Sequence, residues 1–273
     1  MQTQVSRVPK LQSGSRRSFS GRTACGLLAL ALAAAGCSHK QAAREAPAAT
    51  LFTPRPPTFL SGPMAVLFTN TAGFSARLVV ENEAFRNPAR PLTGQLLGRS
   101  PWLLFAPDPG EVPDKHAPAG GYSYLWNPAE QRGFVLSEAL QGYAPVAQKL
   151  QATNVTIRLT QAAAQKIGGH ACATEEATVQ LSDGSQTVFQ VWQATDLKGF
   201  PVRISATSNA APLAVSLSKI RLEPPTADLF APPEGFTRYD SPEMMADELV
   251  MRQHNLKRKG REELEPLDRP ARE

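Results

Sequence analysis

The stretch ATVQLSDGSQTVFQVWQA, residues 177–194, decides the fold of this chain. Apolar and polar residues alternate on both sides of Asp183-Gly184, which is the two-residue period of a half-buried strand. An Asp-Gly pair between two such runs indicates a hairpin, because a type I′ turn needs positive φ at both central residues. The stretch therefore predicts two antiparallel strands joined by a tight turn.

The chain continues in the same way downstream. The segment TDLKG, 195–199, predicts a turn in which Gly199 takes a left-handed conformation. Alternation returns in FPVRISAT, 200–207, and in APLAVSLSKIRLE, 211–223. In the last of these the apolar parity shifts at Ile220, as a β-bulge would cause. Together with the opening hairpin, these runs predict four successive strands in an antiparallel meander.

Strand patterns also fill the first half of the chain. Segments 74–81 and 153–160 alternate between apolar and polar residues, and shorter apolar runs lie between them. Two other segments, 136–151 and 160–167, have a composition typical of helices. Near the end, Ser-Pro-Glu at 241–243 predicts a helix start, with a capping residue, a proline at the first position and an early acid. We expect this helix to stop at Gly260.

These patterns together favour a mainly β domain. Short strands with turn-rich spacing predict a curled antiparallel sheet, or half-barrel, with a few covering helices. We expect four parts: a signal peptide over 1–36, a proline-rich tether over 37–61, the half-barrel domain over 62–240, and a C-terminal helix with a charged tail over 241–273. The third part is long enough for one domain with a substantial core.

The amino-terminal segment indicates export. Residues 1–25 hold five basic residues and no acidic one, and the apolar run GLLALALAAAG follows over 26–36. A membrane span takes about 20 apolar residues, so this shorter run fits a secretory signal instead. Cys37 follows directly, and AAGC resembles a bacterial lipobox. The resemblance implies that Cys37 receives a diacylglycerol thioether and, after cleavage, a fatty acyl group such as palmitate. The alternative is an ordinary cleaved signal with a chance cysteine.

Lipidation would hold the mature chain at a membrane surface. Several acyl chains anchor a protein stably, whereas one chain holds it only marginally. By the sorting preference of some bacteria, Ser38 after the cysteine favours the outer membrane of the cell envelope, facing the periplasm. We therefore expect the membrane, through this lipid, as one partner of the protein.

The net charge argues against a nucleic-acid partner. The whole chain carries 29 Lys and Arg against 24 Asp and Glu. The signal accounts for the whole difference, so the mature chain has no average excess of positive charge for binding polyphosphate. The cluster KRKGR at 257–261 is either a solvated helix end or a contact for anionic lipid headgroups.

Two segments resemble a known family of envelope proteins. FQVWQATDLKGFPVRI, 189–204, resembles a strand–turn–strand of the LolA/LolB-like lipoprotein-localisation factors, and DLFAPPEGFTRY, 228–239, resembles their closing motif. The resemblance covers residues 66–240. It implies a half-barrel of antiparallel strands closed by helices, with an apolar cavity that accepts acyl chains in the carriers, and it implies no catalytic residues. The loop 107–121 lacks the exposed apolar tip of the membrane-bound acceptors. This argues against a true lipoprotein acceptor and favours an uncharacterised relative within the superfamily.

On that resemblance we expect a lipid or acyl chain as the ligand. The candidate ligand site consists of apolar side chains on predicted strands, namely Phe74, Leu78, Phe189, Val191, Trp192, Val202 and Ile204. Strand parity can place all of them except Trp192 on a shared face. The alternative for these residues is ordinary core packing.

The expected protein is a non-catalytic, membrane-anchored binder with no cofactor and no metal. The alternative function is an envelope scaffold that contacts a protein partner through its sheet edge or its C-terminal helix. One cluster contains reactive side chains: GGHACATEE, 168–176, brings His170 near Cys172, as in an activated thiol or a pair of metal ligands. We interpret it as a turn entering a strand, with Cys172 as a small buried residue.

Overall fold

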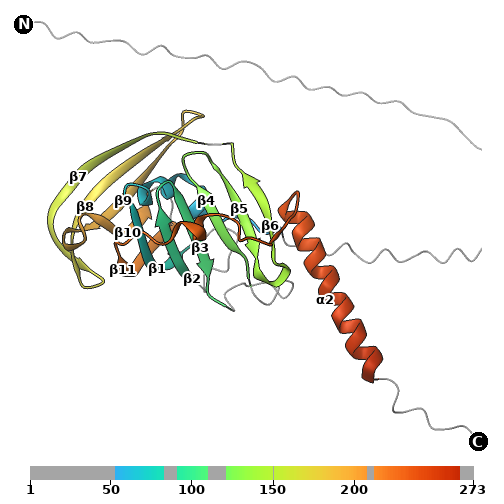
Figure 1. Ribbon diagram of the computed structural model, residues 1–273. Coiled ribbons are helices and arrows are strands. Elements are labelled where there is room, and N and C mark those ends of the chain that lie inside the picture. The colour runs from blue at the N-terminus through green and yellow to red at the C-terminus, as the bar shows by residue number, and fades with distance from the viewer. Residues whose placement is uncertain (1–52, 83–90, 110–120, 150, 208–211, 265–273) are drawn as a thin grey trace, which may run out of the picture. The chain divides into compact units, whose positions relative to one another are not determined.

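A computed structural model describes residues 53–82, 91–109, 121–149, 151–207 and 212–264, and side chains 161–164 and 256–264 are outside that description (Figure 1). The chain divides into two units, Met1–Ala46 and Pro47–Glu273. The predicted signal, Cys37 and most of the predicted tether lie outside the described residues, as do most of loop 107–121 and the side chains of the KRKGR cluster. Everything described below belongs to the second unit.

Strands dominate this unit. Its helical elements are α1 (Thr58–Ser61), η1 (Pro63–Phe68), η2 (Glu138–Leu140), η3 (Thr195–Leu197), η4 (Ala227–Phe230) and α2 (Pro242–Leu264), where η denotes a 3-10 helix. Its strands are β1 (Gly73–Glu81), β2 (Leu92–Arg99), β3 (Trp102–Pro107), β4 (Ser123–Asn127), β5 (Arg132–Ser137), β6 (Gly142–Ala147), β7 (Ala152–Ile167), β8 (His170–Leu181), β9 (Gln186–Ala194), β10 (Phe200–Ala206), β11 (Ala214–Arg221) and β12 (Thr237–Arg238).

All of these strands join one curled, unclosed sheet. Their order across the sheet is β12-β6-β5-β4-β3-β2-β1-β11-β10-β9-β8-β7. Neighbours pair antiparallel except for β12 with β6, which is parallel. The strands β1 and β11 therefore join two meanders, and β7 forms one edge of the sheet. The prediction of a mainly β, curled sheet with few helices is confirmed.

The meander β8–β11 forms as the sequence predicts, with one difference at the Asp-Gly turn. Gly184 has a φ of +84°, but Asp183 is not left-handed, so the turn is not type I′. The Oδ1 of Asp183 instead accepts hydrogen bonds from the backbone N–H and the hydroxyl of Ser185. The expected left-handed Gly199 is present with a φ of +75°. The expected bulge in β11 is also present, with Lys219 at a φ of +50°.

Two helix predictions are wrong. Segment 136–151 contains one short 3-10 helix and the strand β6, and segment 160–167 is the second half of β7. Alanine and glutamine are good helix formers, but helix propensity is a weak determinant, and pairing overrides it here because β8 offers β7 a long hydrogen-bonding partner. The C-terminal helix begins as predicted at Pro242, with the Ser241 hydroxyl accepting a hydrogen bond from the Met244 N–H, but it continues past Gly260.

A plug of helical residues fills part of the concave face of the sheet. This plug, Thr58–Phe68, comprises α1 and η1 and is drawn in blue in Figure 1. Phe59 and Leu60 are completely buried in it, so packing begins inside the segment that the sequence assigns to the tether. Full burial of such a side chain contributes about 1.5–3 kcal/mol. The plug is therefore a structural part of the domain.

The chain between β11 and β12 covers one end of the convex face. The chain from β11 to β12 crosses the outside of β2–β6 (Figure 1), and Phe230 of η4 packs there against Leu125 and Leu136. The Arg99 guanidinium fastens this crossing by donating to the Pro225 carbonyl at 2.7 Å. After β12, the first turns of α2 return to the concave core through Met245 and Leu249.

Candidate functional site

Most of the predicted ligand-site residues are buried in the hydrophobic core. Phe74, Leu78, Phe189 and Ile204 are each at most 2% exposed and belong to the same cluster as the plug. The ring of Phe74 lies 4.7 Å from that of Phe200, centroid to centroid. These residues share the concave face as predicted, but in this region the plug fills that face.

Two predicted residues face the other way. Val202 is buried on the convex side with Cys172, and Trp192 packs at the border of the same cluster. The register of β10 against β9 shifts between Pro201 and Arg203, so Val202 is the extra residue of a bulge. A bulge changes the parity of the strand, which is why Val202 and Ile204 do not share a face.

Val191 is the one predicted residue that reaches a pocket in the described part of the chain. This concave pocket has a volume of about 230 Å³ and lies where the plug ends, between η1, β7, β8, β9 and the start of β10. Its walls consist of Leu67, Asn70, Thr71, Ile157, Glu175, Ala177, Val191, Gln193, Lys198, Gly199, Phe200 and Pro201.

An exposed apolar row leads out of this pocket. Val155, Ile157 and Leu159 of β7 lie opposite Val179, Ala177 and Glu175 of β8 in the ladder. Since Ala177 and Val179 belong to the concave core, the row lies on the concave side of the sheet. We call Val155, Ile157 and Leu159 the β7 stripe; they are 38%, 43% and 57% exposed. Ile157 belongs both to the stripe and to the pocket wall.

The pocket has a polar rim. The Gln193 side-chain amide donates a hydrogen bond to the Glu175 carboxylate at 2.6 Å. Lys198 ends η3 in a left-handed conformation with a φ of +56°, and Gly199 follows it with positive φ as well. The turn therefore adds a lysine and the open backbone of a glycine to a pocket wall that is partly polar and partly apolar.

The two reactive side chains of the sequence cluster, His170 and Cys172, have different hydrogen-bond partners. The Nδ1 of His170 lies 2.7 Å from the Asp196 carboxylate, and the hydrogen bond from the His170 side chain lowers the pKa of Asp196. The Cys172 thiol is buried and donates to the backbone carbonyl of His170, at 3.3 Å. Burial raises the pKa of Cys172, which opposes formation of the reactive thiolate.

The described residues contain neither a metal-binding cluster nor a membrane-spanning helix. Within them, no group of three or more His, Cys, Asp or Glu side chains is arranged to hold a metal ion. No helix in the described ranges is both long enough and apolar enough to cross a membrane.

The sequence contained some of the signal for this pocket. The alternation of 153–160 predicts a strand with Ile157 on one face, but it does not say that nothing covers that face. Leu67 lies in the apolar run MAVLF, 64–68, which carries no strand period and gives no hint that it enters a half-barrel. Glu175 and Gln193 meet only because β8 and β9 pair in this register.

Comparisons with known proteins give distant likenesses in structure. No family model and no curated protein matches the sequence. An uncharacterized conserved protein from Thermus thermophilus matches with a TM-score of 0.40 and 10% identity, over 64% of this chain and 94% of that chain. Lipoprotein LppX of Mycobacterium tuberculosis matches with a TM-score of 0.34 and 13% identity, over 61% of this chain and 94% of that chain.

A LolA superfamily protein from Nitrosomonas europaea also matches, with a TM-score of 0.31 and 9% identity, over 65% of this chain and 98% of that chain. The superfamily that segments 189–204 and 228–239 resemble is thus among the structures found. With TM-scores below 0.5, these are distant likenesses in fold.

Proposed function

We propose that this protein binds the apolar chain of a lipid at the open end of its concave face, without catalysing a reaction. The observation that carries the proposal is the continuity between the concave pocket and the β7 stripe through Ile157. Large exposed apolar side chains in a row cost free energy in water unless a partner covers them. An acyl chain would cover this row and end in the pocket.

The dimensions suit a long, thin ligand. Ligand pockets usually measure about 300–1,000 Å³, and 230 Å³ is smaller than that. The pocket therefore holds one end of the ligand. From Val155 to Leu159 the strand runs about 13 Å at 3.3 Å per residue, and this length supports the remainder of the chain.

We further propose that the protein works as a lipid-anchored envelope lipoprotein. The lipobox-like AAGC and the basic and apolar segments before Cys37 support this anchor. Intact mass measurement of the mature amino terminus tests it: a diacylglycerol and acyl mass on Cys37 is expected, and Cys37→Ser should remove that mass. An unmodified amino terminus would contradict the lipid anchor. It would not bear on the ligand-site proposal, which has its own test.

Native mass spectrometry of the full chain in a gentle detergent tests the ligand site. We expect retention of a phospholipid or uptake of an added fatty acid. Ile157→Glu places a charge between stripe and pocket, and we expect it to abolish uptake, because desolvating a carboxylate against an acyl chain is costly. Thr156→Glu is the matched control: Thr156 is also exposed on the same strand but faces away.

The two variants separate the outcomes. Uptake that survives Thr156→Glu and is lost in Ile157→Glu supports the site. No uptake by the unaltered chain, or equal loss in both variants, contradicts it, and the predicted scaffold role at the sheet edge would then be the better account.

A further inference from the structure

The convex face of the sheet carries a second, chemically different depression. It has a volume of about 440 Å³ and lies over β11, β1 and β2 and the end of β3. The polar side chains that line it are Ser75, Arg77, Gln95, Asp108, Lys219 and Arg221. We call it the cationic groove. It lies on the opposite side of the sheet from the concave pocket, because the neighbouring Ala76 and Leu78 of β1 belong to the concave core.

Strand register fixes two of the cations. Arg221 of β11 lies directly opposite Ser75 of β1, and Arg77 is two residues further along β1 on the same face. Diagonal neighbours of this kind are about 7–8 Å apart at the backbone. Both guanidinium groups can therefore reach one ligand between them, and Gln95 lies opposite Arg77 on the other side.

The bulge in β11 supplies the third cation. Lys219 has a φ of +50°, a conformation that costs a residue other than glycine free energy. β-Bulges commonly re-aim a side chain, and here the bulge places an exposed lysine at the rim. Among the residues that the structure describes, neither Lys219 nor Arg221 has a carboxylate partner.

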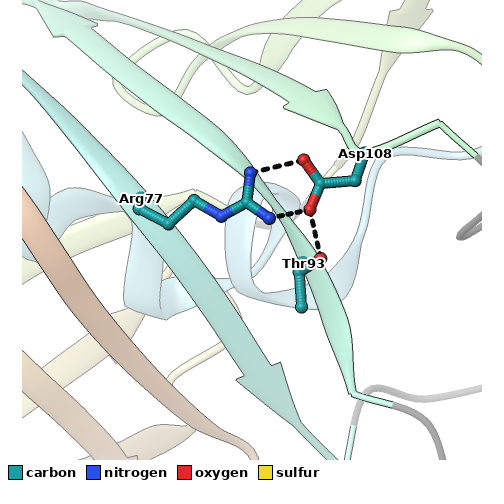
Figure 2. Close-up of polar contacts among 3 residues, drawn as sticks. All are labelled: Arg77, Thr93 and Asp108. Atoms are coloured by element: carbon teal, nitrogen blue, oxygen red, sulfur yellow. Dashed lines mark hydrogen bonds and ion pairs between the residues drawn. The ribbon is translucent and has the colours of Figure 1, made fainter.

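The Asp108 carboxylate holds the Arg77 side chain in place. Figure 2 shows the Asp108 carboxylate accepting hydrogen bonds from both terminal nitrogens of Arg77 and from the hydroxyl of Thr93. Burial raises the pKa of Asp108, but the hydrogen bonds from Thr93 and Arg77 and the Arg77 charge outweigh it and lower that pKa overall. Asp108 is therefore ionised at neutral pH and fixes the orientation of the Arg77 guanidinium in the wall of the groove.

We propose that the cationic groove binds a phosphate monoester group. Three cations and one carboxylate leave a net charge of two positive units, which matches a phosphate monoester of about −1.5 to −2 at pH 7. The Arg221 guanidinium and the Lys219 ammonium supply charge-assisted donors to its oxygens, and Arg77 adds its positive charge and the N–H groups that do not bond to Asp108. Ser75 and Gln95 add neutral donors. This site does not depend on the acyl-chain proposal, since it uses other residues on the other face.

Isothermal titration of the full chain tests the groove with inorganic phosphate and with glycerol 3-phosphate. Saturable one-to-one binding is expected. Lys219→Asn should weaken it about tenfold or more, because a charged hydrogen bond contributes about 1.5–3 kcal/mol. Asparagine tolerates the left-handed conformation, so the melting temperature should not fall. Lys166→Asn is the control, since it removes one exposed lysine of β7 outside the groove.

Vesicles of phosphatidylcholine with phosphatidic acid distinguish the source of the phosphate. Binding to these vesicles in addition to the soluble probes, again lost in Lys219→Asn, would mark a lipid headgroup as the ligand. Binding to the soluble probes alone would mark a free phosphate compound. Absence of binding to both soluble probes, or equal weakening by Lys166→Asn, would overturn the proposal.

Discussion

The concave face of this sheet has two ends that differ in one respect. Over β1–β5 the plug covers the strands, and residues such as Phe74 and Phe105 are completely buried. Over β7 nothing in the described chain covers the strand, and the β7 stripe stays exposed. The sequence patterns of 74–81 and 153–160 are alike, so the pattern alone does not make a residue core or surface. An apolar strand residue becomes part of the core where another segment covers it, and it stays on the surface where none does.

Removal of a plug residue should give the largest effect on stability. Phe59→Ala deletes a completely buried ring that packs edge-on against Phe105 at 5.1 Å. Such truncations cost about 3–5 kcal/mol, which chemical denaturation would measure as a lower midpoint. A loss below about 1 kcal/mol would mean that the plug does not fill the half-barrel in solution.

The pH dependence of stability should show that the plug-covered end of the concave face is buried. Tyr122 lies just before β4, is buried in the concave core, and has its pKa raised to about 12 by that burial. A raised pKa means that the folded protein disfavours the phenolate. Stability is therefore complete below the ordinary value of 10.0 and falls as pH rises from there to about 12.

Denaturation midpoints at a series of alkaline pH values would show this fall. Tyr122→Phe should remove the part of the pH dependence that belongs to this phenol. An unchanged slope in that variant would place the ring in water and contradict the description of the filled end.

Substitution at the open end should give the smallest effect on stability. Ile157→Ser changes a side chain that is 43% exposed, and surface changes of this kind usually stay within about 0.5 kcal/mol. The same variant should weaken fatty-acid uptake. A destabilisation as large as that of Phe59→Ala, measured in the same denaturant series, would remove the difference between the two ends.

Local patterns predicted much of the sheet. The meander β8–β11, the left-handed Gly199 and the bulge near Ile220 all follow from alternation and turn residues within a few positions of each other. The helix start at Pro242 follows from its capping serine. These features depend on short-range physics that a sequence displays directly.

Features that depend on distant partners were not predictable in this way. Segment 160–167 has helix-forming residues but pairs with β8. Val202 changes face because of a bulge that the sequence of its own strand does not predict. The sequence assigns the start of the plug to a tether because the prolines at 54, 56 and 57 directly precede it, while Phe59 packs against Phe105 far along the chain. The concave pocket exists only where that plug ends.

The most direct test of the open concave end is photo-crosslinking with a fatty acid that carries a diazirine near its methyl end. After irradiation of the full chain, peptide mapping should place the label on β7, β8 or β9, at residues that line the pocket such as Ile157 and Val191. Ile157→Glu should abolish the label and Thr156→Glu should keep it. Labelling of the buried plug residues Phe59 and Leu60 or of β1–β5 instead, or no specific labelling, would contradict an acyl-chain site at the open end.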